Sequence, residues 1–467
     1  MNDDQRTQVR DNARYLRNVR PIDPEELYEY VEGQPHPAAV RQVLREQAFE
    51  LELIEQDDVF VPVPEKPVEV PFDGVSVPTE HTERLDALLC ERFGADWSTG
   101  ESGEQLREII VQIKDDYLHQ RPVEYDRDTA LAYAIYHLYD NYAVIQHALM
   151  ELIRGNLVDH RLRVLDIGAG VGGPALGLLD LLEPCLIDYH AVEPSAAASV
   201  FESLVAPGRN QSVTVHRTRA EAFEPAAEYD LVLFANVLSE LNDPVSTVDR
   251  YLDALTPDGT CLLLAPADRN TATGLRETER TLADELGYTV YAPTVRLWPE
   301  LTPSSRAEAW SFDVEPDVSV PSVQRRLADA ASETAETDAS AFINTDVQYA
   351  YSMLRRDDRQ QVTITPDSSR FTPMADTETH VSDRIDLLSV KLSHDLGGEH
   401  PLFLIGDGSQ QIDHFAVLVH ETGLNDALIH TPYGGLLAFE NALVLWNDDE
   451  SAYNLVVDGE TVVDRLA

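Results

Sequence analysis

Lysine, cysteine and long apolar runs are nearly absent from this chain. It has 467 residues and three lysines, at positions 66, 114 and 391. The three cysteines, at positions 90, 185 and 261, are far apart and form no C-x-x-C pair, so we expect neither a disulfide framework nor a metal site. No segment approaches the ~18 apolar residues of a membrane-spanning helix, and no signal peptide follows the first residues, MNDDQRTQVR. The sequence therefore predicts a soluble, cytoplasmic protein without a membrane partner.

Positive charge is also scarce. Acidic residues number 83 and basic residues 35, a formal net charge of −48. An acidic disordered chain is one explanation, but an apolar content of 43% favours folded domains. Acid spread along the whole chain with little lysine is typical of proteins from organisms that accumulate salt. In about 1 M salt the screening length falls to roughly 3 Å, so negative charge does not exclude a nucleic-acid partner.

The length predicts two to four domains. Residues 1–65 begin with helical patterns that start at Asp-Pro and His-Pro pairs, and they end in two short strands around a turn at Asp57-Asp58. Helices followed by a two-stranded wing have the order of a winged helix, although a helical extension with a hairpin stays open. Residues 66–82 are proline-rich and are expected to form an extended linker.

The middle of the chain changes from helices to alternating strands and helices. Residues 83–160 form a helical block whose tyrosine stripe, at positions 133, 136, 139 and 142, is expected to pack against the next domain. Residues 161–360 alternate strand and helix, which predicts a Rossmann-like α/β domain with a parallel sheet covered on both faces. Later strands near 309–315 and 347–356 fit the antiparallel edge hairpin of class I methyltransferase sheets. The acidic stretch 328–340 between them is expected to be a loop.

Residues 380–467 have an all-β pattern. Three strands, a short helical piece near NDALIH and two further strands follow the order of an OB-fold barrel. Such barrels bind single-stranded nucleic acid on a sheet face that carries aromatic and basic side chains. The candidates for that face are Phe403, Phe415, Trp446, Arg384 and Lys391.

The segment VLDIGAGVGG, residues 164–173, fits two ligand-binding patterns at once. Gly168, Gly170 and Gly173 make the G-x-G-x-x-G of dinucleotide-binding domains. Asp166, Gly168, Gly170 and Gly172 make the D-x-G-x-G-x-G that holds S-adenosylmethionine in methyltransferases. A carboxylate at the end of the first strand would repel a pyrophosphate but attract the ammonium and sulfonium groups of S-adenosylmethionine. Asp166 therefore favours S-adenosylmethionine, and a nicotinamide dehydrogenase is the alternative.

Three further residues complete the predicted cofactor site. Glu193 ends the second strand, where a carboxylate can accept both ribose hydroxyls. Glu221 follows the third strand, where an acid can contact the adenine. Asn236 ends the fourth strand and is the candidate to face the methyl group, or else it caps a turn. The D/N-P-P-Y/F sequence of amino-methylating enzymes is missing there, and no residue can be named as a catalytic base.

Four segments together resemble the Rsm-type methyltransferase-like family of the ribosomal small subunit. They are ALAYAIYHLYDNYAVIQHALMEL, VLDIGAGVGG, AVEPS and YDLVLFANVLSEL. The family's mitochondrial members are assembly factors of that subunit and archaea have relatives. The resemblance, taken together with the acidic, lysine-poor composition, implies a halophilic archaeal member. By position it implies that Asp166, Gly168, Gly170 and Glu193 line the cofactor site. Mitochondrial members bind an iron–sulfur cluster through cysteines that residues 290–315 lack, so no cluster is expected.

These observations predict an S-adenosylmethionine-dependent methyltransferase-fold protein that acts on, or assembles, the small ribosomal subunit. Its expected partner is ribosomal RNA or a small-subunit precursor. Two alternatives stay open. One is a non-catalytic assembly factor that binds RNA and uses the cofactor to stabilise its fold. The other is a small-molecule methyltransferase with additional domains.

Overall fold

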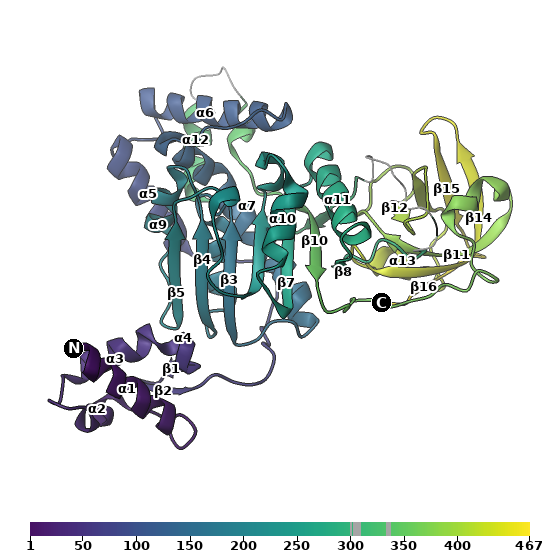
Figure 1. Cartoon of the computed structure of the whole chain (residues 1–467). Helices are drawn as coiled ribbons and strands as arrows, with labels where there is room; N and C mark the ends of the chain where they lie inside the picture. The colour runs from purple at the N-terminus through teal and green to yellow at the C-terminus, as the bar shows by residue number, and fades with distance from the viewer. Residues whose placement is uncertain (299–300, 302–309, 333–337) are drawn as a thin grey trace. The chain divides into compact units, whose positions relative to one another are not determined.

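The computed structural model of the chain describes residues 1–298, 301, 310–332 and 338–467. The chain divides into two compact units. The first holds the N-terminal helices and the first strands of the central sheet, and the second holds the later strands of that sheet and a C-terminal barrel (Figure 1). The first unit comprises Met1–Ala235, Tyr251–Gly259 and Pro316–Val347, and the second comprises Asn236–Arg250, Thr260–Glu315 and Gln348–Ala467. None of the helices in the described residues is long and apolar enough to cross a membrane.

The first 62 residues form a small helical domain with a β-hairpin. Its elements are α1 (Asp3–Leu16), α2 (Pro24–Leu27), α3 (Pro37–Glu46), α4 (Ala48–Leu51), β1 (Leu53–Gln56) and β2 (Val59–Pro62). Asp57 and Asp58, between the strands, have φ angles of 47° and 66°, as a primed hairpin turn requires. A bridge between Ile22 and Phe60 adds a third extended segment to the hairpin. A helix, the bridged segment, three helices and the hairpin follow one another in this order, so the predicted helices and two-stranded wing are present. Both the winged helix and the helical extension with a hairpin fit this order.

The expected linker, residues 66–82, is held against the following domain at several points, among them the Phe72 ring, whose centroid lies 5.2 Å from that of His147. Val68 N–H donates to Val158 O at 2.9 Å, and a bridge joins Pro67 to Asp159. The helical block consists of α5 (Thr79–Phe93), α6 (Gly100–Leu118) and α7 (Arg127–Arg154). Helix α5 therefore begins before the expected end of the linker.

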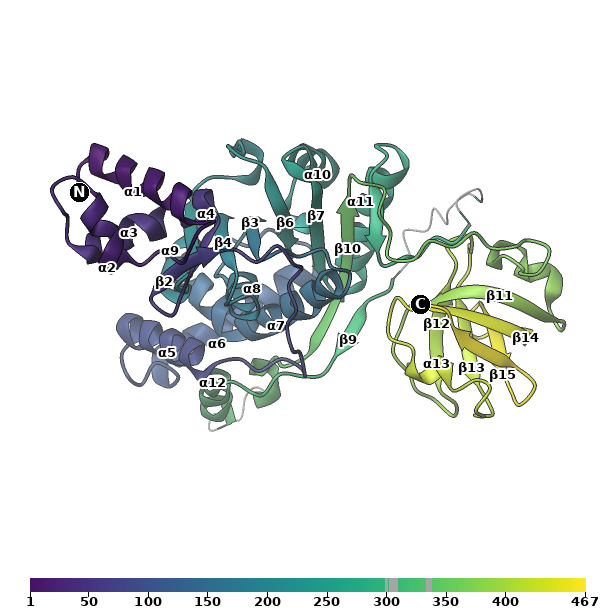
Figure 2. The same ribbon diagram turned by 90° about the horizontal axis from the view of Figure 1, so that it is seen from below.

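Helix α7 is the buried helix of this block. It packs directly on α8 (Gly173–Leu181), and Figure 2 shows α6, α7 and α8 on the same face of the sheet. A Cβ at Gly177 would lie 2.4 Å from the carbonyl oxygen of Tyr142, so the two helices approach each other at a glycine. Tyr142 is buried in this packing and donates its hydroxyl to Asp180 on α8 at 2.9 Å, as the tyrosine stripe predicted. Tyr139 is also buried, whereas Tyr133 and Tyr136 are only partly buried.

The central sheet has the strand order β5-β4-β3-β6-β7-β10-β8. Strand β3 runs parallel to β4 and β6, and β4 runs parallel to β5. The predicted α/β alternation is confirmed. The strands are β3 (Arg161–Ile167), β4 (Leu186–Val192), β5 (Gln211–His216), β6 (Tyr229–Ala235), β7 (Leu255–Pro266), β8 (Thr289–Ala292), β9 (Asp313–Glu315) and β10 (Val347–Arg355); the helices that follow α8 are α9 (Ala197–Leu204), α10 (Pro244–Leu252), α11 (Arg269–Asp284) and α12 (Ser322–Ser332).

The end of the sheet differs from the sequence prediction in one respect. Strands β9 and β10 pair, as expected, and β10 is antiparallel to β7. However, β10 lies inside the sheet, because β8 pairs with its other side and takes the edge. With only four residues, β8 shows too few alternations to be distinguished from a loop in sequence. The loop expected at 328–340 falls partly on residues 333–337, outside the described residues, and α12 covers its beginning.

The C-terminal unit ends in a closed barrel with OB-fold connectivity. Its strands follow the order β11-β12-β13-β15-β14, β14 pairs back with β11, and β13 and β15 are parallel. The sequence predicted one final strand, but the chain turns at Asp458–Thr461 and forms two strands there. The second of these two strands pairs with β14. The elements are β11 (Arg384–Lys391), β12 (Leu402–Gly406), β13 (His414–Leu418), α13 (Ala427–His430), β14 (Leu436–Asn447), β15 (Ala452–Val457) and β16 (Val462–Arg465).

Candidate cofactor site

The loop between β3 and α8 depends on its glycines. Gly168, Gly170 and Gly172 have φ angles of 74°, 54° and 94°, a region that residues with a Cβ rarely adopt. A Cβ at Gly172 would lie 2.6 Å from the Val205 side chain, so that glycine is needed for packing. A Cβ at Gly170 would meet nothing closer than 3.9 Å. The space over Gly170 is therefore open for a ligand to approach the backbone.

Asp166 lies at the end of β3 with no exposed surface. Its Oδ2 accepts a hydrogen bond of 2.6 Å from the Tyr189 hydroxyl on β4, while its Oδ1 is buried without a partner among the described residues. Burial raises the pKa of Asp166 to about 7, because water no longer solvates the carboxylate. A buried oxygen without a hydrogen bond is costly. A cationic ligand group at Oδ1 would remove that cost.

Glu193 follows β4 and closes the other side of the glycine loop. Its Oε2 accepts the Gly170 N–H at 3.0 Å, and its Oε1 accepts the Ser195 N–H at 2.8 Å. These bonds hold the carboxylate in one orientation beside the loop. Each carboxylate oxygen has a second lone pair, so Glu193 can still accept hydrogen bonds from two ribose hydroxyls. The residues at this loop therefore fit S-adenosylmethionine.

The other two predicted residues occupy different environments. Asn236 directly follows β6, is half-buried, and donates its N–H to Leu264 O at 3.0 Å. Its φ angle is 59°, a left-handed conformation that Asn tolerates and that is often found at functional sites. Glu221 lies in the short 3-10 helix Ala220–Ala222 and is exposed.

A histidine–carboxylate pair on α7 is the feature that the sequence did not reveal. His137 Nδ1 lies 2.9 Å from Asp140 Oδ2. The Asn344 amide donates to the same oxygen at 2.8 Å, so Asp140 is held as an acceptor and His137 Nδ1 carries the proton of this bond. The rings of Tyr133 and Tyr136 lie 4.9 and 4.8 Å from the imidazole. The Nε2 of His137 makes no hydrogen bond within the described residues, so it is available as a base.

The histidine lies on the face of α7 that approaches the glycine loop. One turn further along α7, Asn141 lies close enough to Gly173 that a Cβ there would be 3.0 Å from the Asn141 Cβ. The Asn141 amide also donates to the Tyr133 hydroxyl at 3.2 Å. Ahead of the helix, Tyr125 O accepts the N–H of Ala196, just past Glu193, at 3.2 Å. One signal in the sequence could have revealed this pair, because His137 and Asp140 stand three positions apart, at helical spacing, within the tyrosine stripe.

Two of the five residues predicted for an RNA-binding face of the barrel, Phe403 and Lys391, are buried, and the other three keep some exposed surface. Phe403 is in the barrel core. Lys391 is buried and donates to three backbone carbonyls, those of residues 428, 429 and 431. Arg384 donates to the Asp458 carboxylate. Phe415 is half-buried, and Trp446 keeps 38% of its surface exposed. Alternation along a strand sends half of its residues inward, and composition did not show which half.

Metal chemistry finds no support in the described part of the chain. No group of three or more His, Cys, Asp or Glu side chains there could hold a metal ion. Residues 290–315, from which a cluster-binding cysteine set is missing, lie partly outside the described residues, namely at 299–300 and 302–309.

The sheet order with its antiparallel β10, together with the D-x-G-x-G-x-G loop, defines a Rossmann-like methyltransferase domain, and its cofactor is S-adenosylmethionine. Residues 125–311 match the family model described as a methyltransferase domain. The flanking regions match a domain of unknown function, DUF8157. Residues 6–57 match its N-terminal domain and residues 375–466 its C-terminal domain. No curated protein matches the chain.

Solved methyltransferase structures are similar to parts of the chain at low identity. The sugar N-methyltransferase KedS8 from Streptoalloteichus is 15% identical over 30% of this chain and 54% of its own, with a TM-score of 0.24. DesVI from Streptomyces venezuelae is 18% identical over 30% of this chain and 58% of its own, with a TM-score of 0.24. The plantazolicin methyltransferase BpumL, in complex with a triazolic desmethylPZN analog and SAH, is 13% identical over 54% of this chain and 99% of its own, with a TM-score of 0.31. The chain thus spans little more than half the length of KedS8 and DesVI. Likenesses this weak carry no weight for its function.

Proposed function

We propose that this protein is an S-adenosylmethionine-dependent methyltransferase whose acceptor is RNA of the small ribosomal subunit. The observation that carries the methyltransferase proposal is the buried Asp166 Oδ1, which has no partner among the described residues and lies where the glycine loop leaves β3. Asp166 would bind the ammonium group of the cofactor, and Glu193 would bind its ribose hydroxyls.

The chain's own residues suggest how proton transfer would accompany methylation. The cofactor supplies an electrophilic methyl group, and the acceptor atom that takes it must lose a proton. His137 Nε2 would take that proton, because Asp140 holds the ring by its Nδ1–H at 2.9 Å and stabilises the imidazolium that results. Most of the remaining catalysis would come from positioning. Asn236, in its left-handed conformation, stays the candidate to face the methyl group.

The RNA target is supported by sequence and by architecture. The tyrosine-rich helix, the glycine loop and YDLVLFANVLSEL resemble the small-subunit family. A helical domain with winged-helix order precedes the methyltransferase domain, and an OB-fold barrel follows it. Both folds commonly bind nucleic acid, and several weakly binding modules on one chain raise avidity by perhaps 10²–10⁴. A small-molecule enzyme would need neither module.

The test uses the full-length protein and small-subunit precursors from a strain that lacks it. With limiting methyl-labelled S-adenosylmethionine, we expect label in the precursor RNA and much less label with Asp166→Asn. On sucrose gradients the tagged protein should sediment with immature small subunits. Co-sedimentation without label would support the non-catalytic assembly factor. A protein found only at the top of the gradient, with normal subunit ratios in the deletion strain, would overturn the RNA target in favour of a small-molecule enzyme.

A further inference from the structure

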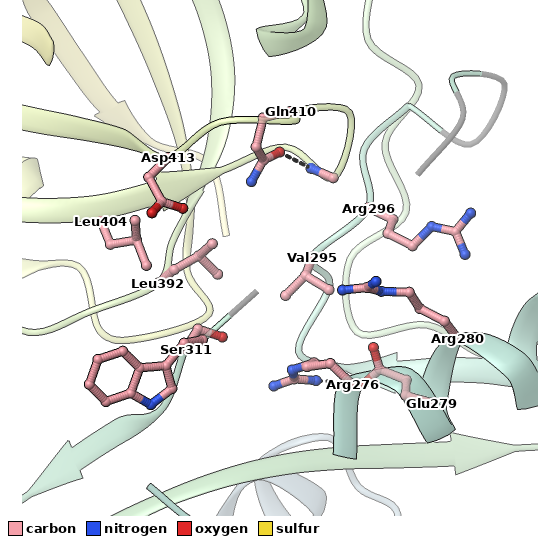
Figure 3. A pocket seen from close by; sticks show the side chains of 12 residues that line it. Arg276, Glu279, Arg280, Val295, Arg296, Ser311, Leu392, Leu404, Gln410 and Asp413 are labelled. Carbon is pink, nitrogen blue, oxygen red and sulfur yellow. Dashed lines mark hydrogen bonds and ion pairs between the residues drawn. The ribbon is translucent and has the colours of Figure 1, made fainter. Parts of the chain in front are cut away.

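Three arginines line one small cavity in the second unit (Figure 3). Arg276 and Arg280 lie one turn apart on α11, and Arg296 follows β8. The chain has 35 basic residues against 83 acidic ones, so three guanidinium groups at one cavity run against its composition. Two carboxylates, Glu279 and Asp413, also line this cavity.

Arg276 is buried with an unsatisfied donor. Its side chain is 3% exposed and makes an ion pair of 2.5 Å with Glu279, whose side chain is 2% exposed. Another of its nitrogens donates to the Tyr433 hydroxyl at 3.2 Å. Its Nε is buried and has no hydrogen-bond partner among the described residues. One carboxylate therefore leaves this guanidinium incompletely satisfied, which is costly for a buried charged group.

Arg280 is held beside two other cations. Burial lowers the pKa of Arg280, and the charges of Arg276 and Arg296 lower it further, against the opposite effect of Glu279 and Glu277. Arg296 pairs with Asp284 on α11. Arg280 is therefore subject to repulsion from both of its arginine neighbours. A bound anion would relieve the repulsion between these guanidinium groups.

Apolar side chains form part of the cavity wall, and a backbone hydrogen bond supports it. Val295, Leu392, Leu404 and the exposed Trp310 supply its apolar lining. The barrel turn is held against residues 295–297, since Leu297 N–H donates to Asp407 O at 2.8 Å. The cavity volume is about 70 Å³. One water needs about 10–15 Å³ by this measure, so there is room for roughly five to seven such atoms, enough for a phosphate group.

We propose that this cavity binds a phosphate group, supplied either by an RNA backbone or by free phosphate. Guanidinium groups bind phosphate oxygens through paired N–H donors, and a tetrahedral anion can accept from more than one arginine at once. Arg280 and the unsatisfied Nε of Arg276 are the donors, and Arg296 adds positive charge. None of the cavity's residues belongs to the proposed cofactor site, so the proposal does not rest on methyl transfer.

The test is calorimetric titration of the full-length protein, without S-adenosylmethionine, with inorganic phosphate and in parallel with a single-stranded RNA oligonucleotide. Arg280→Gln should weaken phosphate binding roughly ten- to a hundredfold, the loss typical of one charge-assisted contact. The matched control is Arg465→Gln, which removes the same charge from exposed Arg465 on β16 of the same unit and should change nothing. Arg296→Gln is the second variant if Arg280→Gln does not fold, and it should weaken phosphate binding in the same direction.

The two ligands distinguish the source of the phosphate. Weakened binding of both phosphate and RNA in Arg280→Gln would identify an RNA-backbone site, and weakened binding of phosphate alone would identify a free phosphate ligand. No binding of phosphate to the unmodified protein, or equal binding by the unmodified protein and Arg280→Gln, would overturn the proposal. These measurements do not involve methylation, so they can fail or succeed independently of the proposed function.

Discussion

Asp166 and Tyr189 share a buried hydrogen bond of 2.6 Å between neighbouring strands β3 and β4. The bond satisfies one oxygen of the carboxylate and leaves the other buried without a partner among the described residues. Tyr189 is itself fully buried, and its pKa is raised well above its ordinary value by burial and by the neighbouring carboxylate. The hydroxyl therefore stays a donor, and the unsatisfied oxygen is the one left for a ligand.

Removing either carboxylate at the glycine loop should weaken cofactor binding. We expect Asp166→Ala and Glu193→Ala each to lose about one to two decades of affinity for S-adenosylmethionine, since each removes a charge-assisted contact worth ~1.5–3 kcal/mol. Glu221→Ala, at the exposed position expected to contact the adenine, should weaken affinity less than either loop variant. Calorimetry measures all three. Unchanged affinity in both loop variants would refute the site, and binding of NADH would restore the dehydrogenase alternative.

The buried carboxyl also predicts a pH dependence. The pKa of Asp166 is about 7, raised from 3.8, so between these values the native chain keeps a proton that the unfolded chain has lost. The contribution of the protonated Asp166 carboxyl to the free energy of unfolding is complete below about pH 4 and is lost as the pH rises through 7. Cofactor affinity should rise over the same range, because the ionised form attracts the ammonium group.

Asp166→Asn is the control for that titration, because its amide does not ionise. The free energy of unfolding of the unmodified protein, measured relative to Asp166→Asn without cofactor, should fall by up to about 1.4 kcal/mol per pH unit between pH 4 and 7. Denaturant titrations at several pH values give this difference. A difference that does not change with pH would show that the carboxyl ionises normally in the native protein.

His137 should matter for turnover and little for cofactor binding. We expect His137→Gln to lower kcat by about 10²–10⁴, the usual contribution of a general base, with S-adenosylmethionine affinity unchanged. Asp140→Asn should lower kcat less and move the pH profile, because the ring keeps its Nε2 but loses its charged partner. Tyr136→Phe keeps the ring beside His137 and is the control. Equal rates in His137→Gln and Tyr136→Phe would show that the histidine has only a structural role.

The close approach of α7 and α8 should make Gly177 intolerant of a side chain. A Cβ there would meet Tyr142 O and the Ile145 side chain at 2.4 Å, so Gly177→Ala should destabilise by about 1–3 kcal/mol. At Gly274, on α11, a Cβ would have no atom within 4 Å, so Gly274→Ala should stabilise by up to about 1 kcal/mol. Thermal melting distinguishes the two, and a Gly177→Ala protein as stable as the parent would mean that the helices can separate.

Local patterns were enough to predict much of the fold. Alternating apolar strands and helices indicated the parallel sheet, and the order of strands and helix indicated the barrel, because both patterns have a period visible within a few residues. Prediction from local patterns failed where an element was short. Strand β8 has four residues, and nothing near it in sequence shows that β10, more than fifty positions later, pairs with it.

The sequence by itself determined the glycine loop, its acid at position 166 and the turn at Asp57-Asp58, because each depends on backbone conformations that only certain residues tolerate. Tertiary structure alone decided which side chains became available for chemistry. Asp140 accepts a hydrogen bond from Asn344, which lies about two hundred positions later in the sequence. Lys391 and Arg384 donate hydrogen bonds to groups within the barrel. A side chain's partners come from distant segments, and burial then decides the cost of leaving a polar group without one. That cost exists only in the folded chain, which is why the unsatisfied oxygen of Asp166 could not be predicted from its neighbours in sequence.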